Sequence, residues 1–99
     1  MIKKYNGKDL NEIIKEGTWI LDFSATWCGP CRMIEPILEE LSNNYNILKI
    51  DVDENKDIAK KYGVMSIPTI IIFKDGSNKG ESIGFKSKEE IEKLIKESN

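Results

Sequence analysis

Two cysteines are the residues of this chain most able to do covalent chemistry. Cys28 and Cys31 lie three positions apart in the segment Trp27-Cys28-Gly29-Pro30-Cys31. Residues three apart on a helix are neighbours, with Cβ atoms roughly 5–6 Å apart, so a small adjustment brings both sulfur atoms within bonding distance. A disulfide here closes almost no loop, so stability is a poor reason for the pair. The spacing predicts a dithiol that opens and closes reversibly.

The position of Cys28 favours its thiolate form. A strand is predicted before it and a helix after it, and the unpaired N–H groups and dipole of a helix start stabilise negative charge. Gly29 keeps a side chain away from an approaching substrate, and Pro30 presets a helical φ where its missing N–H is not needed. We therefore expect Cys28 to attack a substrate disulfide and Cys31 to resolve the mixed disulfide that results.

Other uses of the cysteines fit the sequence less well. The chain has no histidine, which removes Cys-His and Ser-His catalysis. A structural zinc site needs four ligands, and there is no second cysteine pair to complete one. A metal bridging two copies of the chain and a pair of inert buried cysteines are the remaining alternatives.

Five segments carry the strand pattern that must position this pair. They cover residues 2–5, 18–25, 47–52, 69–73 and, around a polar stretch, 80–84. The second segment is apolar on both faces apart from Asp22 and Ser24, which is typical of a strand covered on both sides. Asp75-Gly76 predicts the turn that joins the last two strands.

Two helices are expected in the first half of the chain. The first would be capped by Asn6 and would stop at Gly17. The second follows the cysteines with an apolar stripe over residues 33–41, and Pro36 predicts a kink within it. Its acidic residues are interpreted as a solvated helix face; they are Glu35, Glu39 and Glu40.

Two more helices complete the pattern. One is short and ends at Gly63, and the last begins with a capping box made by Ser87 and Glu90. The order βαβαβαββα predicts a parallel layer closed by an antiparallel hairpin. The fold class is therefore α/β, a single domain over residues 1–99 with a central mixed sheet and helices on both faces.

The charge and hydrophobicity of the chain limit the classes of binding partner that we expect. The net charge is −2, from 17 acidic and 15 basic side chains, so no single-sign field favours nucleic acid or an anionic membrane. The first residues have no apolar run typical of a signal peptide, and the longest apolar stretch, residues 70–73, is far too short to span a bilayer. We expect the protein to stay where it is made, in the cytoplasm.

At this point the sequence resembles a known family. Trp27-Cys28-Gly29-Pro30-Cys31 is similar to the active-site motif of thioredoxins, and Ser66-Ile67-Pro68-Thr69 resembles the cis-proline loop of that family. The resemblance covers nearly the whole chain. Glutaredoxins, periplasmic oxidases and protein disulfide isomerases usually carry other dipeptides between the cysteines. The resemblance implies the thioredoxin fold, a five-stranded mixed sheet with two helices on each face.

The resemblance also implies a substrate surface. Pro68 would be cis and would lie against the cysteine pair, and the backbone of Ile67 would pair with an extended substrate strand. The other positions would flank the disulfide and shape the docking surface. The implied substrate-binding set is Trp27, Gly29, Pro30, Ile67, Pro68 and Gly84.

Two further residues gain catalytic roles from the resemblance. Asp22 matches the buried aspartate of the family, which lies beneath the second cysteine and manages its proton, and Lys49 matches the lysine beside it. A carboxylate in an apolar strand is expensive to bury and should have a raised pKa, as suits a proton acceptor. Ser24 departs from the family, since many thioredoxins have tryptophan there, and it leaves less aromatic bulk beside the site. The N-terminus is also slightly short.

The function implied is reduction of protein disulfides by a monomer with no bound cofactor, kept reduced by a thioredoxin reductase. An oxidase or isomerase of the same fold is the second reading, and the Gly-Pro dipeptide argues against it. The third is a binding subunit that uses the same surface to stabilise a partner.

Overall fold

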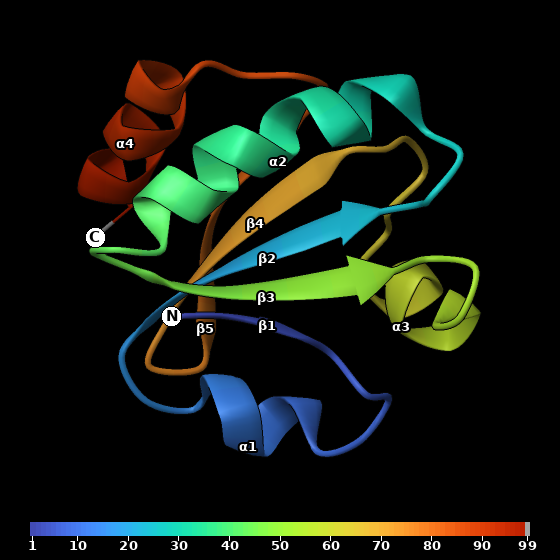
Figure 1. The fold of residues 1–99 in the computed structure, drawn as a ribbon. Coiled ribbons are helices and arrows are strands. Elements are labelled where there is room, and N and C mark those ends of the chain that lie inside the picture. The colour runs from blue at the N-terminus through green and yellow to red at the C-terminus, as the bar shows by residue number, and fades with distance from the viewer. Residues whose placement is uncertain (99) are drawn as a thin grey trace.

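The computed structural model describes residues 1–98 and shows the predicted order of elements (Figure 1). Residue 99 of the predicted domain lies outside the described residues. The strands are Ile2–Lys4 (β1), Thr18–Ser24 (β2), Asn46–Asp51 (β3), Thr69–Lys74 (β4) and Ser77–Ile83 (β5). The helices are Leu10–Ile14 (α1), Gly29–Leu41 (α2), Lys56–Lys61 (α3) and Lys88–Glu97 (α4).

The strands form one mixed sheet in the order β1-β3-β2-β4-β5. The first three pair in parallel, β4 pairs antiparallel with β2, and β5 pairs antiparallel with β4. Strand β2 therefore lies at the centre of the sheet, with hydrogen-bonded neighbours on both sides. The strand that leads into the cysteines is thus held by ladders along both of its edges.

Each face of the sheet is covered by two helices, as predicted (Figure 1). Alternation along the strands sends Leu21, Leu48 and Ile71 into a core with α1 and α3. Their neighbours Ile20 and Ile47 enter a second core with α2 and α4. Asp22 and Lys49 have the parity of this second set, so both face the side of the sheet that α2 covers.

Most boundaries match the sequence prediction. The first four strands agree with their predicted ranges to within one residue at each end. The capping box of α4 is also present: the Glu90 N–H donates to the Ser87 hydroxyl, and the Ser87 N–H donates to the Glu90 carboxylate, at 3.1 Å each. Helix α2 runs unbroken through Pro36, which is exposed. The kink at this proline stays a prediction.

Two expectations were wrong. Asn6 does not cap α1: Asp9 precedes the helix with a φ of 59° and no side-chain cap, while the Asn6 side chain accepts a hydrogen bond from the Lys8 N–H in the loop before it. The intervening Gly7, at φ 90°, turns the chain and delays the helix. The last strand starts at Ser77, earlier than predicted, because it is largely polar and exposed and has no apolar pattern to mark its start.

Candidate active site

The cysteine pair lies at the junction of β2 and α2, where the sequence predicts it. Cys28 is the N-cap residue of α2, with extended backbone angles, and Cys31 lies in the first helical turn. The two form a disulfide with Cα atoms 5.3 Å apart. Both side chains are buried against Ala25 and the half-buried Val52 and Ile67. The pair therefore joins the extended residue before the helix to a residue of its first turn.

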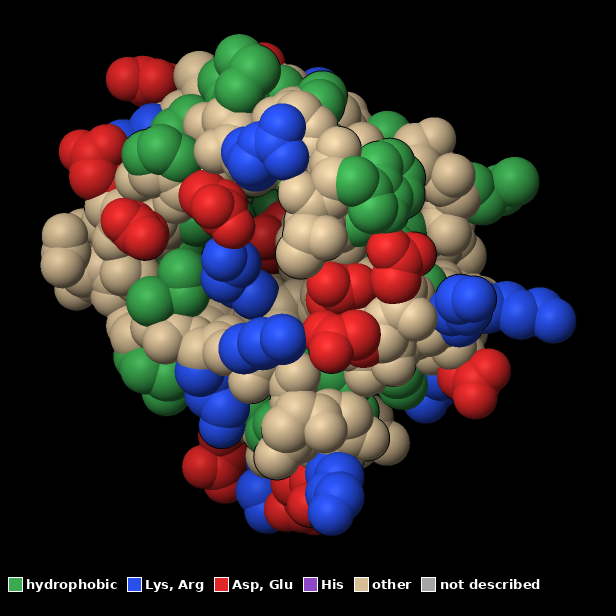
Figure 2. Space-filling view, turned by 45° about the vertical axis from the view of Figure 1, so that its right-hand side comes forward, with side chains coloured by type: hydrophobic (Ala, Val, Ile, Leu, Met, Phe, Trp, Pro, Cys, Tyr) green, Lys and Arg blue, Asp and Glu red, His purple; other side chains and the backbone are tan. Residues whose placement is uncertain are grey.

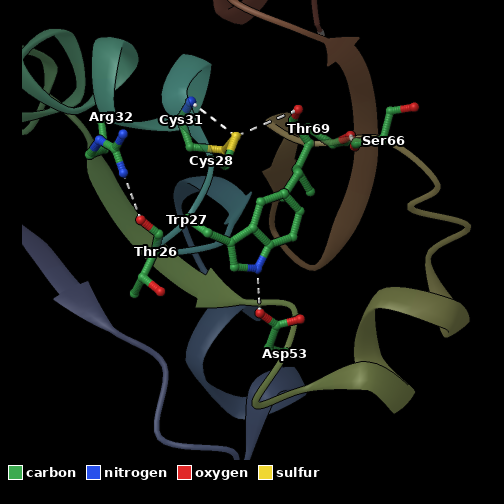
Figure 3. Close-up of a disulfide and its surroundings, with 9 residues drawn as sticks. Thr26, Trp27, Cys28, Cys31, Arg32, Asp53, Ser66 and Thr69 are labelled. Atoms are coloured by element: carbon green, nitrogen blue, oxygen red, sulfur yellow. Dashed lines mark hydrogen bonds between the residues drawn. A yellow bond between two sulfur atoms is a disulfide. The ribbon is translucent and has the colours of Figure 1, made fainter.

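The helix start is aimed at the sulfur of Cys28. The Cys31 N–H donates to Cys28 Sγ at 3.2 Å (Figure 3). Pro30 lies in the first turn, where a missing N–H leaves no bond unmade. The Arg32 guanidinium donates to the Thr26 carbonyl oxygen at 2.9 Å and ties the helix to the preceding loop. A backbone N–H and a helix dipole placed in this way favour negative charge on a sulfur atom.

A loop from the other half of the chain lies against this sulfur. The Ile67–Pro68 peptide bond is cis, as the resemblance implies. The carbonyl oxygen of Ile67 lies 3.9 Å from Cys28 Sγ. The Thr69 hydroxyl donates to the Ser66 carbonyl at 2.5 Å, and the Gly84 N–H donates to the Pro68 carbonyl at 2.8 Å. The fold therefore brings Ile67, Pro68 and Gly84 to the cysteine pair.

Trp27 is held beside the disulfide by a partner that the sequence did not indicate. Its indole N–H donates to Asp53 Oδ2 at 2.8 Å, although 66% of the tryptophan surface is exposed (Figure 3). Asp53 lies in the turn after β3, 26 positions away. A carboxylate in a polar turn has no sequence pattern that distinguishes it, so only the structure identifies this contact.

Exposed hydrophobic side chains occur in the segments next to these residues. Met65 precedes the Ile67–Pro68 loop and is 96% exposed, and Phe85 follows Gly84 and is 42% exposed. On the face shown in Figure 2, hydrophobic side chains reach the surface in small separate groups, with acidic and basic side chains interspersed. This face has no large area of a single charge.

Asp22 is fully buried on β2 and has no hydrogen-bond partner at either carboxylate oxygen. Burial raises its pKa from 3.8 to about 7; Lys49 lowers it, Glu35 raises it, and Ser24 lowers it slightly. The Ser24 hydroxyl acts from nearby without a hydrogen bond of normal geometry to either oxygen. The pKa expected of a carboxyl in an apolar strand is thus found, and it lies near neutral pH.

Lys49 and Asp22 occupy paired positions on adjacent strands. The ammonium of Lys49, however, contacts Glu35 Oε1 at 2.6 Å. Glu35 is 46% exposed and so partly solvated, as expected, but its ion pair with Lys49 was not predicted. Glu35 follows Cys31 by four residues, which places the two on the same face of α2. That spacing indicates that Glu35 lies near Cys31, but it does not indicate the contact with Lys49. Glu39 and Glu40 are exposed, as expected.

A cleft of about 350 Å³ opens beside Cys31. Residues of β1, β2, α2 and β3 and of the loop after β2 line it. They are Lys4, Ser24, Ala25, Thr26, Cys31, Arg32, Glu35, Lys49 and Asp51. Ser24 lies in this lining, at the position where many thioredoxins carry tryptophan. The small side chain leaves the hollow open, in agreement with the reduced bulk expected there.

Within residues 1–98, no helix has the length and apolar character needed to cross a membrane. Over the same residues, no three His, Cys, Asp or Glu side chains are grouped so as to hold a metal ion.

Comparisons with known proteins agree with this geometry. The family model described as Thioredoxin matches residues 1–97. The chain is 49% identical over 98 residues to a thioredoxin of Staphylococcus epidermidis, covering 95% of this chain and 94% of that protein. A thioredoxin of Staphylococcus aureus is 48% identical, with the same coverage.

Solved structures show the same fold. A mutant thioredoxin from Halobacterium salinarum superposes with a TM-score of 0.90 at 35% identity, covering 98% of this chain and 89% of that one. The reduced thioredoxin pre-protein of Schistosoma mansoni gives 0.81 at 39% identity, covering 91% and 87%. Both similarities extend over most of this chain, and so over the sheet that positions the cysteine pair.

Proposed function

The chain belongs to the thioredoxin family and is a thiol–disulfide oxidoreductase, and we propose that Cys28 is its nucleophile and Cys31 its resolving cysteine. The Cys28 thiolate attacks one sulfur of a substrate disulfide, and the other substrate sulfur leaves as a thiolate. Cys31 then loses its proton and attacks Cys28 Sγ, which forms the Cys28–Cys31 disulfide and releases the second substrate sulfur. Two electrons pass from the dithiol to the substrate.

One observation carries this assignment of roles. Cys28 Sγ accepts the Cys31 N–H at the start of α2, so the structure provides for negative charge on Cys28. Both cysteines are buried, Cys28 at 5% and Cys31 at 2% exposed, so the helix-start hydrogen bond, and not exposure, distinguishes them. The first cysteine is therefore the one that a substrate disulfide meets.

We assign the proton of Cys31 to Asp22. With a pKa of about 7, this carboxyl exchanges a proton readily at neutral pH, as a general base or acid requires. It faces the side of the sheet that α2 covers, and its register partner Lys49 lines the cleft beside Cys31. Lys49, on the adjacent strand, adjusts the charge of this site.

The substrate surface is proposed around the disulfide. Ile67 precedes the first ladder position of β4, so its backbone is not used by the sheet and can pair with an extended substrate segment. Trp27 offers an exposed ring fixed by its bond to Asp53, and Gly84 leaves open space beside the Pro68 carbonyl. Gly29 has open space where a side chain would stand, which lets a substrate approach closely. Pro30 lies beside it.

Reduction is the proposed direction, in the cytoplasm, with a monomer that a thioredoxin reductase keeps reduced. The curated relatives named thioredoxin and the Gly-Pro dipeptide support this direction over oxidation. Equilibration with a glutathione redox buffer distinguishes the two. A reductase-type pair becomes oxidised in a buffer where an oxidase-type pair stays reduced.

Turnover of insulin disulfides by the reduced protein tests the cysteine roles. Cys28→Ser should show no turnover, and Cys31→Ser should accumulate a mixed disulfide without releasing product. Thermal unfolding of each variant, compared with the reduced wild type, controls for loss of the fold. Turnover by Cys28→Ser, or a wild-type rate for Cys31→Ser, would contradict the assignment.

A further inference from the structure

Lys49 lies between two carboxyl groups and pairs with only one of them. Asp22 is its register partner on β2, and Glu35 approaches from α2. The ammonium contacts Glu35 at 2.6 Å and forms no ion pair with Asp22, whose oxygens have no hydrogen-bond partner. The buried carboxyl therefore has no direct contact with the cation at its register position, although the charge of Lys49 still acts on it.

Three elements contribute charged groups to the cleft next to Asp22. On the β4 side its register partner is Ile70, which carries no charge. On the cleft side, β1 contributes one group, and α2 and β3 contribute two each. They are Lys4, Arg32, Glu35, Lys49 and Asp51. Of these, Lys49 and Glu35 are the two whose charges act on Asp22, and they act in opposite directions.

Glu35 is well placed to control that cation. Its side chain is 46% exposed and that of Lys49 is 32% exposed, so their contact lies at the mouth of the cleft and not in the core. An ion pair in this setting contributes little to stability because water screens it. The ion pair can still orient the Lys49 ammonium toward the cleft, even where it adds little to the free energy of unfolding.

We propose that Glu35 is a positioning residue for the resolving step: it holds the Lys49 ammonium at the cleft and so leaves Asp22 free to carry a proton at neutral pH. This inference rests on the proposed role of Asp22. When Cys31 attacks Cys28 Sγ, the Cys31 proton passes to the Asp22 carboxylate. The bond between Cys28 and the substrate sulfur breaks, and the substrate thiolate takes a proton from solvent.

Removing the charge of Glu35 would lower the pKa of Asp22. The Lys49 charge would no longer be neutralised, and Asp22 is the carboxyl that remains on the paired position of the adjacent strand. The carboxylate form of Asp22 would be stabilised, both by the cation and by the loss of repulsion from Glu35. Asp22 would then release its proton at lower pH and bind the Cys31 proton less tightly.

Glu35→Gln tests the proposal, because it removes the charge and keeps the shape of a partly exposed side chain. The readout is the titration of the Asp22 carboxyl carbon, followed by NMR in the oxidised protein. We expect its midpoint to fall by about one pH unit. Glu39→Gln is the matched control, since it removes the same charge from an exposed position of the same helix without a contact to Lys49, and it should leave the midpoint in place.

A second variant, Lys49→Met, shows whether Glu35 acts on Asp22 through Lys49 or directly by its own charge. Lys49→Met should raise the Asp22 midpoint, and Glu35→Gln added to it should move the midpoint much less than in the wild type. An unmoved midpoint in Glu35→Gln, or a shift of equal size in the Lys49→Met background, would overturn the proposal.

The pH dependence of product release gives the kinetic counterpart. In Glu35→Gln the pH midpoint of the resolving step should move to lower pH together with that of Asp22. Asp22→Asn should slow this step and remove its dependence on pH near 7. Unchanged kinetics in Asp22→Asn would refute the role of Asp22 in proton transfer, while the NMR titration would still decide whether Glu35 controls Lys49.

Discussion

Replacing Asp22 by asparagine should make the oxidised protein more stable at alkaline pH and should have far less effect in acid. The buried carboxyl has a pKa of about 7 in the folded protein against an ordinary value of 3.8. At about 1.4 kcal/mol for each unit of pKa, the difference corresponds to about 4 kcal/mol. Asparagine has a similar shape and cannot ionise.

The direction of this pH dependence follows from whether the folded or the unfolded state binds the Asp22 proton more tightly. Between pH 3.8 and about 7 the folded protein keeps the proton on Asp22 while the unfolded chain loses it, so each rise in pH in this range favours unfolding. The stabilisation is complete below the lower value and lost above the upper one. The free energy of unfolding of the wild type, relative to Asp22→Asn, should therefore fall by about 4 kcal/mol between about pH 4 and about pH 8.5.

Urea unfolding of both proteins across this range measures the difference, because the other titrating groups are shared and cancel. Both cysteines are in the disulfide, so no thiol titrates in the oxidised protein. Asp57→Asn, at an exposed site in the first turn of α3, is the control and should change by less than about 1 kcal/mol. A difference between wild type and Asp22→Asn that stays constant from acid to alkaline pH would refute the reasoning.

Three other substitutions have defined outcomes. A Cβ at Gly80 would lie 2.5 Å from the Ser98 hydroxyl oxygen, so Gly80→Ala should lower the free energy of unfolding by about 1–3 kcal/mol in a urea titration. Gly29→Ala is the control and should lower it far less, because a Cβ at Gly29 would have open space around it. Ser87→Ala removes the cap of α4 and should cost about 1 kcal/mol in thermal unfolding. Trp27→Phe loses the indole hydrogen bond and should raise the KM for insulin several-fold with kcat nearly unchanged. An unchanged KM would show that the bond to Asp53 does not contribute to docking.

The sequence predicts those parts of the fold that depend on apolar periodicity and on local signals at helix ends. The two-sided burial of β2, the position of Cys28 at a helix start and the capping box at Ser87 follow from patterns within a few residues. The start of strand β5 escaped because an exposed edge strand needs no apolar residues to form its ladder. Asn6 failed as a cap because Gly7 turns the chain before the helix begins.

The site was predictable to a different extent. The cysteine pair follows from spacing alone, whereas the placement of Ile67 and Pro68 beside it came from the family resemblance. Neither the local sequence patterns nor the family resemblance predicted the contacts between distant segments. Asp53 reaches Trp27 across 26 positions, and Glu35 reaches Lys49 across 14, and each depends on how a turn or a helix docks on the sheet. Such pairings are decided by tertiary packing and leave no local pattern.

The central position of β2 has a consequence for the synthesis of the protein. Cys28 and Cys31 leave the ribosome about forty residues before Pro68, and β2 has only its parallel neighbour β3 until β4 emerges and pairs with it. Domains generally fold as units during translation. A nascent chain that stops before β4 therefore carries two cysteines without the loop that faces them. If the proposed substrate surface is right, we expect catalytic activity only after β4 has paired with β2.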